Sequence, residues 1–493
     1  MPDSFYWHDY ETWGADPRRD RACQFAGLRT DTNLNEVGHP LLLYCRPATD
    51  LLPHPDACLL TGITPQLASR QGIIEAEFAA RVHAVLSEPG TCGVGFNSFR
   101  FDDEITRHLL YRNLYDPYAR EWRNGNSRWD LIDTLRLAHA LRPEGMAWPT
   151  HADGTVSFKL EQLTAANGID HAQAHDALAD VRATITLARR LRQAQPRLFD
   201  YALSLRDKQR VRDLLSRGEP LLHVSARYSA ALGCLAPVFP VAPHPTNSNG
   251  IICFDLRTDP AQLLDFSVED IRARLFTPVA TLPESSERIP LKTIHLNRAP
   301  ILASIKTLTA TAAQRWKIDP DQAAERAQWI AASAPEIKRR VQMVHQVPET
   351  QGETDPDLQL YTGGFFSDPD RRSMEVIHRL APNQLNSDDL AQLSLTFKDT
   401  RLPRLLFRYR ARNWPETLSP NERDDWDAER FLRLTDPASG AGIQIEQYEQ
   451  RLRELTEIHA NDPQKQDILN ALSSWSEQLL DAGRDYIGNA DFC

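Results

Sequence analysis

Polar and apolar residues alternate along residues 5–12, the first strand-like stretch of the chain, which is also rich in aromatic side chains. Alternation with a period of two is typical of a β-strand, and it places Asp9 and Glu11 on the same face. Two further apolar runs, 22–29 and 40–45, follow with a polar stretch between them. The pattern therefore predicts an antiparallel meander of three strands near the start of the chain.

Helical spacing of apolar residues begins after this meander. Residues 75–86 form an amphipathic pattern, and the short apolar run 92–96 predicts a buried strand. Further helices are expected at 102–114, at 158–167 and in a long segment that ends near residue 194. Strands that first form a meander and then alternate with helices imply an α/β fold, in which helices cover a mixed sheet.

The rest of the chain changes character twice. Short β-like runs separated by proline and asparagine occupy residues 221–300, with helical additions at 268–275 and 320–346. Beyond a polar run at 351–357, the apolar residues have helical spacing, which predicts an all-helical last part. A chain of 493 residues is too long for one core, and we predict three domains. Their expected bounds are residues 1–195, 196–350 and 351–493.

Composition places the chain among ordinary globular proteins, with 41% hydrophobic and 25% charged residues. The sequence has no apolar stretch of membrane-spanning length and no pattern of a secretory signal. Its 7 cysteines are scattered and form no Cys-x-x-Cys pair, which argues against a disulfide framework and against a zinc site. We therefore expect a cytoplasmic protein that does not bind membranes.

The charge is unevenly distributed. A formal net charge of -11 disfavours a nucleic-acid partner, because phosphate binding is largely electrostatic. Between residues 189 and 219, however, nine basic side chains outnumber four acidic ones. This run is either a local basic groove or a solvated helix face.

Three places carry candidate catalytic chemistry. Asp9 and Glu11 repel one another unless a cation lies between them, and hard divalent ions prefer such oxygen ligands; the alternative is a solvent-facing edge strand. Asp102 lies where a strand ends and a helix begins, which is a usual place for ligands in α/β folds, but it could equally cap the helix. His175 and Asp180 open the long helix, where a single histidine or aspartate is more often structural.

Taken together, these residues resemble the three motifs of the DEDDh exonucleases: Asp9-x-Glu11, residues 97–102, and His175-x-x-x-x-Asp180. Longer stretches resemble the bacterial exonuclease I family, at residues 5–13, 60–65, 100–104, 126–130, 141–145 and 167–177. The resemblance implies a ribonuclease-H-like exonuclease domain, an SH3-like β-barrel domain and an all-helical C-terminal domain. It also implies a 3′→5′ exodeoxyribonuclease that degrades single-stranded DNA to 5′-mononucleotides in DNA repair and recombination.

The chemistry of phosphodiester hydrolysis agrees with this resemblance. The reaction needs an activated water, a neutralised phosphate and a stabilised 3′ leaving oxygen, and two divalent ions about 4 Å apart meet all three needs. We expect Mg²⁺, with Mn²⁺ able to substitute, held by Asp9, Glu11, Asp102 and Asp180. His175 is expected to deprotonate the attacking water, because a neutral imidazole with a pKa near 6.5 suits that task at neutral pH.

Binding of a single strand calls for cations along its backbone and aromatic faces for its unstacked bases. Side chains beside the motifs are the candidates for contact with the substrate: Glu11, Trp13, Arg100, Phe101, Arg128 and Trp129. For each aromatic candidate the alternative is a place in the core, where Phe and Trp are common.

The resemblance further implies a protein partner, the acidic tail of the bacterial single-stranded-DNA-binding protein, with Arg142 and Tyr201 in its pocket. We expect a monomer that digests DNA processively. Two alternatives stay open, namely a DEDDh exonuclease that acts on RNA or on polymerase errors, and a nucleic-acid-binding protein without catalysis. Four converging carboxylates favour an enzyme, because a binding module gains nothing from acids that repel phosphate.

Overall fold

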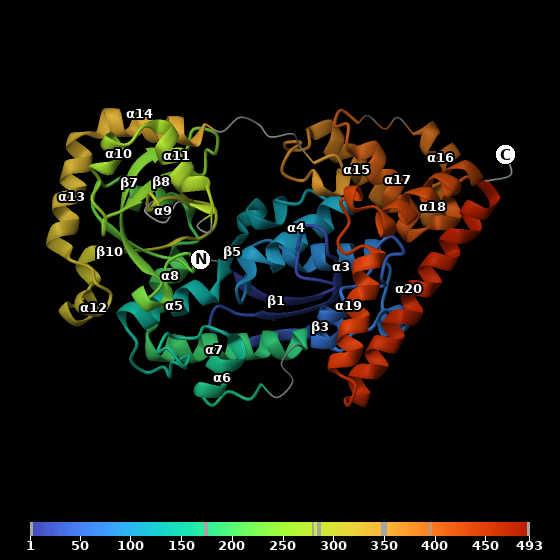
Figure 1. The fold of residues 1–493 in the computed structure, drawn as a ribbon, viewed down its shortest axis with the longest axis horizontal. Coiled ribbons are helices and arrows are strands. Elements are labelled where there is room, and N and C mark those ends of the chain that lie inside the picture. Colours follow the sequence, from blue (N-terminus) through green and yellow to red (C-terminus); the bar gives the residue numbers. More distant parts are fainter. Residues whose placement is uncertain are drawn as a thin grey trace.

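The computed structural model describes residues 3–490, except for 172–175, 279–280, 283–286, 347–352, 394 and 396, and of 482–490 it describes the backbone alone. Figure 1 shows three parts, with one sheet and its helices in the centre, a second sheet on one side and a group of helices on the other. We call them the N-terminal, middle and C-terminal domains. The expected fold class, a mixed α/β sheet followed by a small β domain and a helical domain, is confirmed.

The first sheet has five strands in the order β3-β2-β1-β4-β5. Their bounds are β1 Ser4–Thr12, β2 Ala22–Thr30, β3 Glu36–Tyr44, β4 Thr91–Gly95 and β5 Ser127–Asp130. β1, β2 and β3 pair antiparallel, which confirms the meander, whereas β4 runs parallel to both β1 and β5. The strand that carries Asp9 and Glu11 is therefore the central strand of the sheet.

The third strand is longer than the sequence predicts. It begins at Glu36 instead of residue 40, and its first four residues are exposed. β3 is an edge strand of the sheet, and because these four residues are exposed they need not be apolar. Glu36, Gly38 and His39 therefore give this stretch the pattern of a loop, although Glu36 and Val37 pair with β2.

Helices cover both faces of the first sheet. They are α1 Pro55–Thr61, α2 Pro65–Gln71, α3 Glu75–Ser87, α4 Asp102–Arg112, α5 Leu131–Leu141, α6 Leu160–Ala166 and α7 Ala177–Ala194. Phe5 and Trp7 pack in the same apolar core as α7, while α3 and α4 contribute to a second core on the opposite face. Because Asp9 and Glu11 continue the period of Phe5 and Trp7, they point to the face that α7 covers.

The middle domain follows two connecting helices, α8 Pro196–Ser204 and α9 Lys208–Leu215. Its sheet is antiparallel with the order β10-β6-β7-β8-β9. The strands are β6 Leu221–Val224, β7 Leu235–Pro243, β8 Gly250–Asp255, β9 Leu291–His295 and β10 Ile301–Ser304. The helices are α10 Gln262–Asp265, α11 Val268–Phe276, α12 Ala310–Arg315, α13 Pro320–Ala332 and α14 Ala334–His345.

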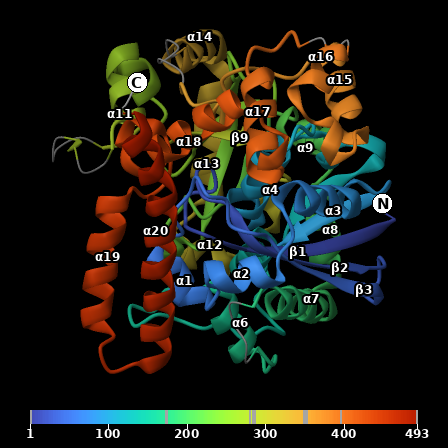
Figure 2. The same ribbon diagram turned by 90° about the vertical axis from the view of Figure 1, so that its right-hand side faces the viewer.

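The C-terminal domain has only helices as regular elements in its described residues. They are α15 Asp368–Arg379, α16 Ser387–Gln392, α17 Leu402–Asn413, α18 Pro420–Thr435, α19 Ile445–Ile458 and α20 Pro463–Ala490. Figure 2 shows α19 and α20 side by side at the outer end of the molecule. Among the described helices, none has the length and apolarity to cross a membrane. The six cysteines that the structure describes are free and buried.

Candidate active site

An acidic cluster forms at the end of β1, where the strand meets α7. Oxygen atoms of Asp9, Glu11 and Asp180 lie within 4.8 Å of one another. The first two come from alternate positions of β1, and Asp180 comes from the first turn of α7, whose N-cap is Asp176. All three side chains are half-buried, so the cluster lies in a recess of the protein and is still open to solvent.

Asp102 lies near this cluster, outside the three carboxylates whose oxygens come within 4.8 Å of one another. It is the first residue of α4 and is 3% exposed, and its Oδ1 accepts a hydrogen bond from the backbone N–H of Tyr10 at 3.2 Å. The chain reaches Asp102 through a sharp turn in which Asn97 has a φ of 64°. The backbone N–H of Asn97 donates to Asp130 at 2.9 Å, which fixes this turn to the end of β5.

Burial and neighbouring carboxylates raise the pKa of Glu11 and of Asp9. Burial and the neighbouring Asp180, Asp102 and Asp176 raise the pKa of Glu11 to about 8. Burial, together with Asp102, Glu11 and Asp180, holds the pKa of Asp9 well above its usual range. The principal charges acting on both groups are acidic. Carboxylates that raise the pKa of their neighbours favour a cation between them, and carboxylate oxygens are the ligands that hard divalent ions prefer. The donor set therefore fits a divalent metal ion.

The proton-accepting residue expected from the sequence, His175, lies outside the described residues. The structure shows a different histidine beside the acids, His171, whose Nε2 is hydrogen-bonded to Asp180. Its Nδ1 lies 3.2 Å from the hydroxyl of Thr164, which fixes the ring. The sequence analysis did not identify His171, and its only local signal is its position four residues before His175.

Two tryptophans expected at the substrate are inside the protein. Trp13 and Trp129 are each 1% exposed and belong to apolar cores. A base cannot reach either ring in this conformation, so the stacking role predicted for them does not fit the structure. The other reading that the sequence left open, a place in the core, describes both residues.

Arg128 is also occupied within the protein. Its guanidinium forms ion pairs with Asp103 at 2.8 Å and Glu121 at 2.9 Å, and it is 7% exposed. By contrast, Arg100 is exposed and Phe101 is half-buried, next to Asp102. These two residues are therefore placed where an incoming strand could contact them.

The residues expected to bind a protein partner lie at the boundary between the N-terminal and middle domains. Arg142 donates to the backbone oxygen of Thr307 at 3.3 Å, and the hydroxyl of Tyr201 donates to that of Leu302 at 2.8 Å. The guanidinium of Arg210 lies 5.5 Å from the centre of the Tyr201 ring. Arg142 and Tyr201 thus both contact the middle domain, and the guanidinium of Arg210 lies beside Tyr201.

A mixed sheet whose central strand ends in a cluster of carboxylates defines a nuclease of the ribonuclease-H-like exonuclease class. Models of three domain families match in sequence: Exonuclease at residues 6–188, Exonuclease I SH3-like domain at 206–347 and Exonuclease I C-terminal domain at 354–479. The chain therefore belongs to the exonuclease I family of exodeoxyribonucleases.

Individual relatives agree over nearly the whole chain. Exodeoxyribonuclease I of Escherichia coli K12 is 42% identical over 97% of this chain and 98% of its own length. The Haemophilus influenzae enzyme is 39% identical over 97% and 99%. Among solved structures, exonuclease I from Methylocaldum szegediense has 48% identity and a TM-score of 0.90, covering 97% of this chain and 99% of that one. Escherichia coli exonuclease I in complex with a dA16 oligonucleotide has 41% identity and the same TM-score, covering 97% and 100%.

Proposed function

We propose that this protein is a 3′→5′ exodeoxyribonuclease that removes 5′-mononucleotides from single-stranded DNA, in DNA repair and recombination. The observation that carries the proposal is the convergence of Asp9, Glu11 and Asp180, with Asp102 beside them, at the end of the central strand. Similar solved structures include Escherichia coli exonuclease I with bound oligonucleotide, which supports single-stranded DNA as the substrate class.

The four acids would hold two Mg²⁺ ions, or Mn²⁺ in their place. When bound, such ions supply a nucleophilic hydroxide at neutral pH and neutralise charge on the phosphate. Hydrogen bonds within the protein orient the carboxylates that would bind the ions. Asp102 is held by the backbone of Tyr10, and Asp180 is held by His171, so two of the proposed ligands have fixed directions before any ion binds.

Proton transfer is assigned to His175. A neutral imidazole can take the proton of the attacking water, and its ordinary pKa matches the physiological range. The resemblance of His175-x-x-x-x-Asp180 to the third DEDDh motif supports this assignment.

Recognition of the substrate and of a partner completes the proposal. Arg100 and Phe101 would contact the strand next to the cluster, since an exposed cation and a half-buried ring suit a phosphate and a base. Arg142 and Tyr201 would form part of a pocket for the acidic tail of the single-stranded-DNA-binding protein. The enzyme would work as a monomer in the cytoplasm.

The test is digestion of a single-stranded DNA labelled at its 5′ end, with Mg²⁺ and with EDTA, by the native protein and by Asp9→Ala. We expect metal-dependent shortening from the 3′ end that the variant abolishes. A matched RNA and a duplex serve as controls. DNA binding without shortening would refute the hypothesis that the protein is an enzyme. Equal digestion of the RNA would favour the ribonuclease alternative.

A further inference from the structure

Glu104 lies on the first turn of α4, two residues after Asp102, and side chains from all three domains contact its carboxylate. Arg107 of α4 donates to Oε1 at 2.8 Å, and Arg298 of the middle domain lies 3.6 Å from the same oxygen. The hydroxyl of Tyr361, from the C-terminal domain, donates to Oε2. The Glu104 side chain is 14% exposed, so these contacts are partly shielded from solvent. One carboxylate thus joins both outer domains to the helix that begins at Asp102.

The contact from the middle domain rests on an anchored segment. Leu296 and Ala299, on either side of it, are buried, and Ala299 belongs to the same core as Phe5 of β1. Arg128 donates to the backbone oxygen of Asn297 at 3.2 Å while its other nitrogen holds Asp103. The segment that carries Arg298 is therefore fixed against the N-terminal domain. Through Arg128 it is also joined to Asp103, the residue after Asp102.

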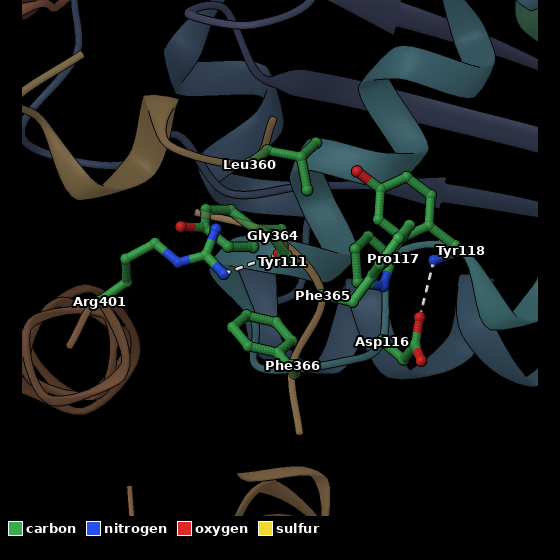
Figure 3. Close-up of a pocket in the computed structure, with 9 residues that line it drawn as sticks. All are labelled: Tyr111, Asp116, Pro117, Tyr118, Leu360, Gly364, Phe365, Phe366 and Arg401. Carbon is green, nitrogen blue, oxygen red and sulfur yellow. Dashed lines mark hydrogen bonds between the residues drawn. The ribbon is translucent and has the colours of Figure 1, made fainter. Parts of the chain in front are cut away.

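The contact from the C-terminal domain is also fixed in place. Arg401 donates to the backbone oxygens of Gln359 at 2.7 Å and of Gly364 at 3.0 Å, which closes the segment that presents Tyr361. Its guanidinium lies 5.0 Å from the centre of the Phe366 ring. Figure 3 shows this arginine reaching towards Gly364, next to the Tyr111 ring of the N-terminal domain. Tyr361 therefore meets Glu104 from a constrained position.

We propose that Glu104 is a positioning residue, through which the middle and C-terminal domains together hold Asp102 in the orientation that a metal ion requires. The first turn of a helix is a rigid unit, so contacts that fix its third residue also fix the direction of its first. The inference rests on the proposed function, because it takes Asp102 as a metal ligand. If it is correct, the affinity of the metal site depends on contacts from the middle and C-terminal domains.

Electrostatics alone predicts the opposite result for one variant, which makes the proposal testable. Arg298→Gln removes a positive charge beside an acidic site, and that change by itself strengthens the binding of a cation. If Arg298 acts by holding Glu104, the same substitution weakens metal binding. Tyr361→Phe removes only a hydroxyl and leaves the charge unchanged, so any weakening there cannot be an effect of charge.

The experiment is calorimetric titration of the full-length protein with Mn²⁺, without DNA. We expect Arg298→Gln and Tyr361→Phe each to weaken binding by about two- to tenfold, the factor that corresponds to losing one net hydrogen bond or ion contact. The matched control is Arg339→Gln, which removes an exposed arginine that pairs with Glu336 on α14, and it should leave the affinity unchanged. The double variant should bind more weakly than either single one.

Tighter or unchanged Mn²⁺ binding by Arg298→Gln, with no change in Tyr361→Phe, would overturn the proposal. Urea unfolding checks that each variant is folded. If Arg298→Gln does not fold, Tyr361→Phe decides alone, because it keeps the aromatic ring and deletes one oxygen. Failure of the proposed function would give a different result. In that case the native protein and Asp9→Ala would bind Mn²⁺ with the same affinity.

Discussion

Glu11 illustrates how one side chain couples folding to metal binding. In the unfolded chain its ordinary pKa is 4.5, whereas burial and three neighbouring acids raise the pKa to about 8 in the metal-free fold. Between these values the folded protein keeps a proton that the unfolded chain has lost. The contribution of Glu11 therefore makes the metal-free fold less stable as the pH rises from about 4.5 to about 8. A bound cation removes this cost because it replaces the proton.

We predict that Mg²⁺ stabilises the protein more at pH 8 than at pH 6. At pH 6 the ion must displace a proton from Glu11, and at pH 8 much of that proton has already been lost. Thermal unfolding with excess Mg²⁺ and with EDTA measures the effect, and the gain should differ between the two pH values by about 2 °C or more. In Glu11→Gln the difference should shrink. An equal gain at both pH values would contradict the prediction.

Among the individual residues of the site, some positions could be predicted from the sequence and others could not. The shared face of Asp9 and Glu11 follows from the period of a strand, which is a local property. The approach of Asp180 depends on how α7 crosses the sheet, and it could be predicted only from the family resemblance. Arg128 looked like a free cation because Asp103 and Glu121, which neutralise it, are its neighbours through folding and not through local spacing. The role of His175 stays a prediction.

At the scale of elements, α4 places two adjacent aspartates in opposite environments. Asp102 faces the acidic cluster, and burial together with the neighbouring Asp103 raises its pKa well above the usual range. Asp103 is buried on the other side of the helix, where Arg120 at 2.5 Å and Arg128 at 2.8 Å hold its pKa well below the usual range. The helix thus separates a site that requires added positive charge from a pair network that is already neutralised.

We predict opposite consequences for the matched substitutions Asp102→Asn and Asp103→Asn. The first should abolish nuclease activity without lowering the stability of the metal-free protein, because a neutral amide replaces a carboxyl group whose charged form is disfavoured there. The second removes the buried carboxylate that Arg120 and Arg128 share, which typically costs about 3–5 kcal/mol. Urea unfolding in EDTA measures both, and a stability loss of similar size in the two variants would refute the assignment.

Helices and strands of this chain were predictable where the periodic pattern had one buried face. The helix α3 satisfies that condition and appears as expected, whereas β1 and β2 are buried on both faces and were predicted from their aromatic and apolar runs. The start of β3 does not satisfy it, since an edge strand with exposed faces has the composition of a loop. The domain boundaries at residues 195 and 350 stay predictions.

At the scale of the whole molecule, a buried ionic cluster attaches the C-terminal domain. Asp50 of the N-terminal domain is 0% exposed and lies 2.8 Å from Arg412 of α17 and 3.0 Å from Arg433 of α18. Arg21 approaches the same carboxylate at 3.0 Å, and Asp357 shares Arg412 at 2.6 Å. These arginines hold the pKa of Asp50 well below its usual value of 3.8, so the cluster stays ionised at neutral pH and weakens only in acid.

We predict that Asp50→Ala loosens the attachment of the C-terminal domain. Three arginines would lose a buried partner, at a cost of about 3–5 kcal/mol. The matched control is Asp56→Ala, which breaks an exposed pair between the same two domains, Asp56 with Arg451 at 2.6 Å, and such pairs contribute about 0–1 kcal/mol. Limited proteolysis should release a C-terminal fragment faster from Asp50→Ala than from either the native protein or the control. Equal protease resistance in all three proteins would show that other contacts hold the domain in place.

Because Glu104 ties the C-terminal domain to α4, Asp50→Ala should also weaken Mn²⁺ binding.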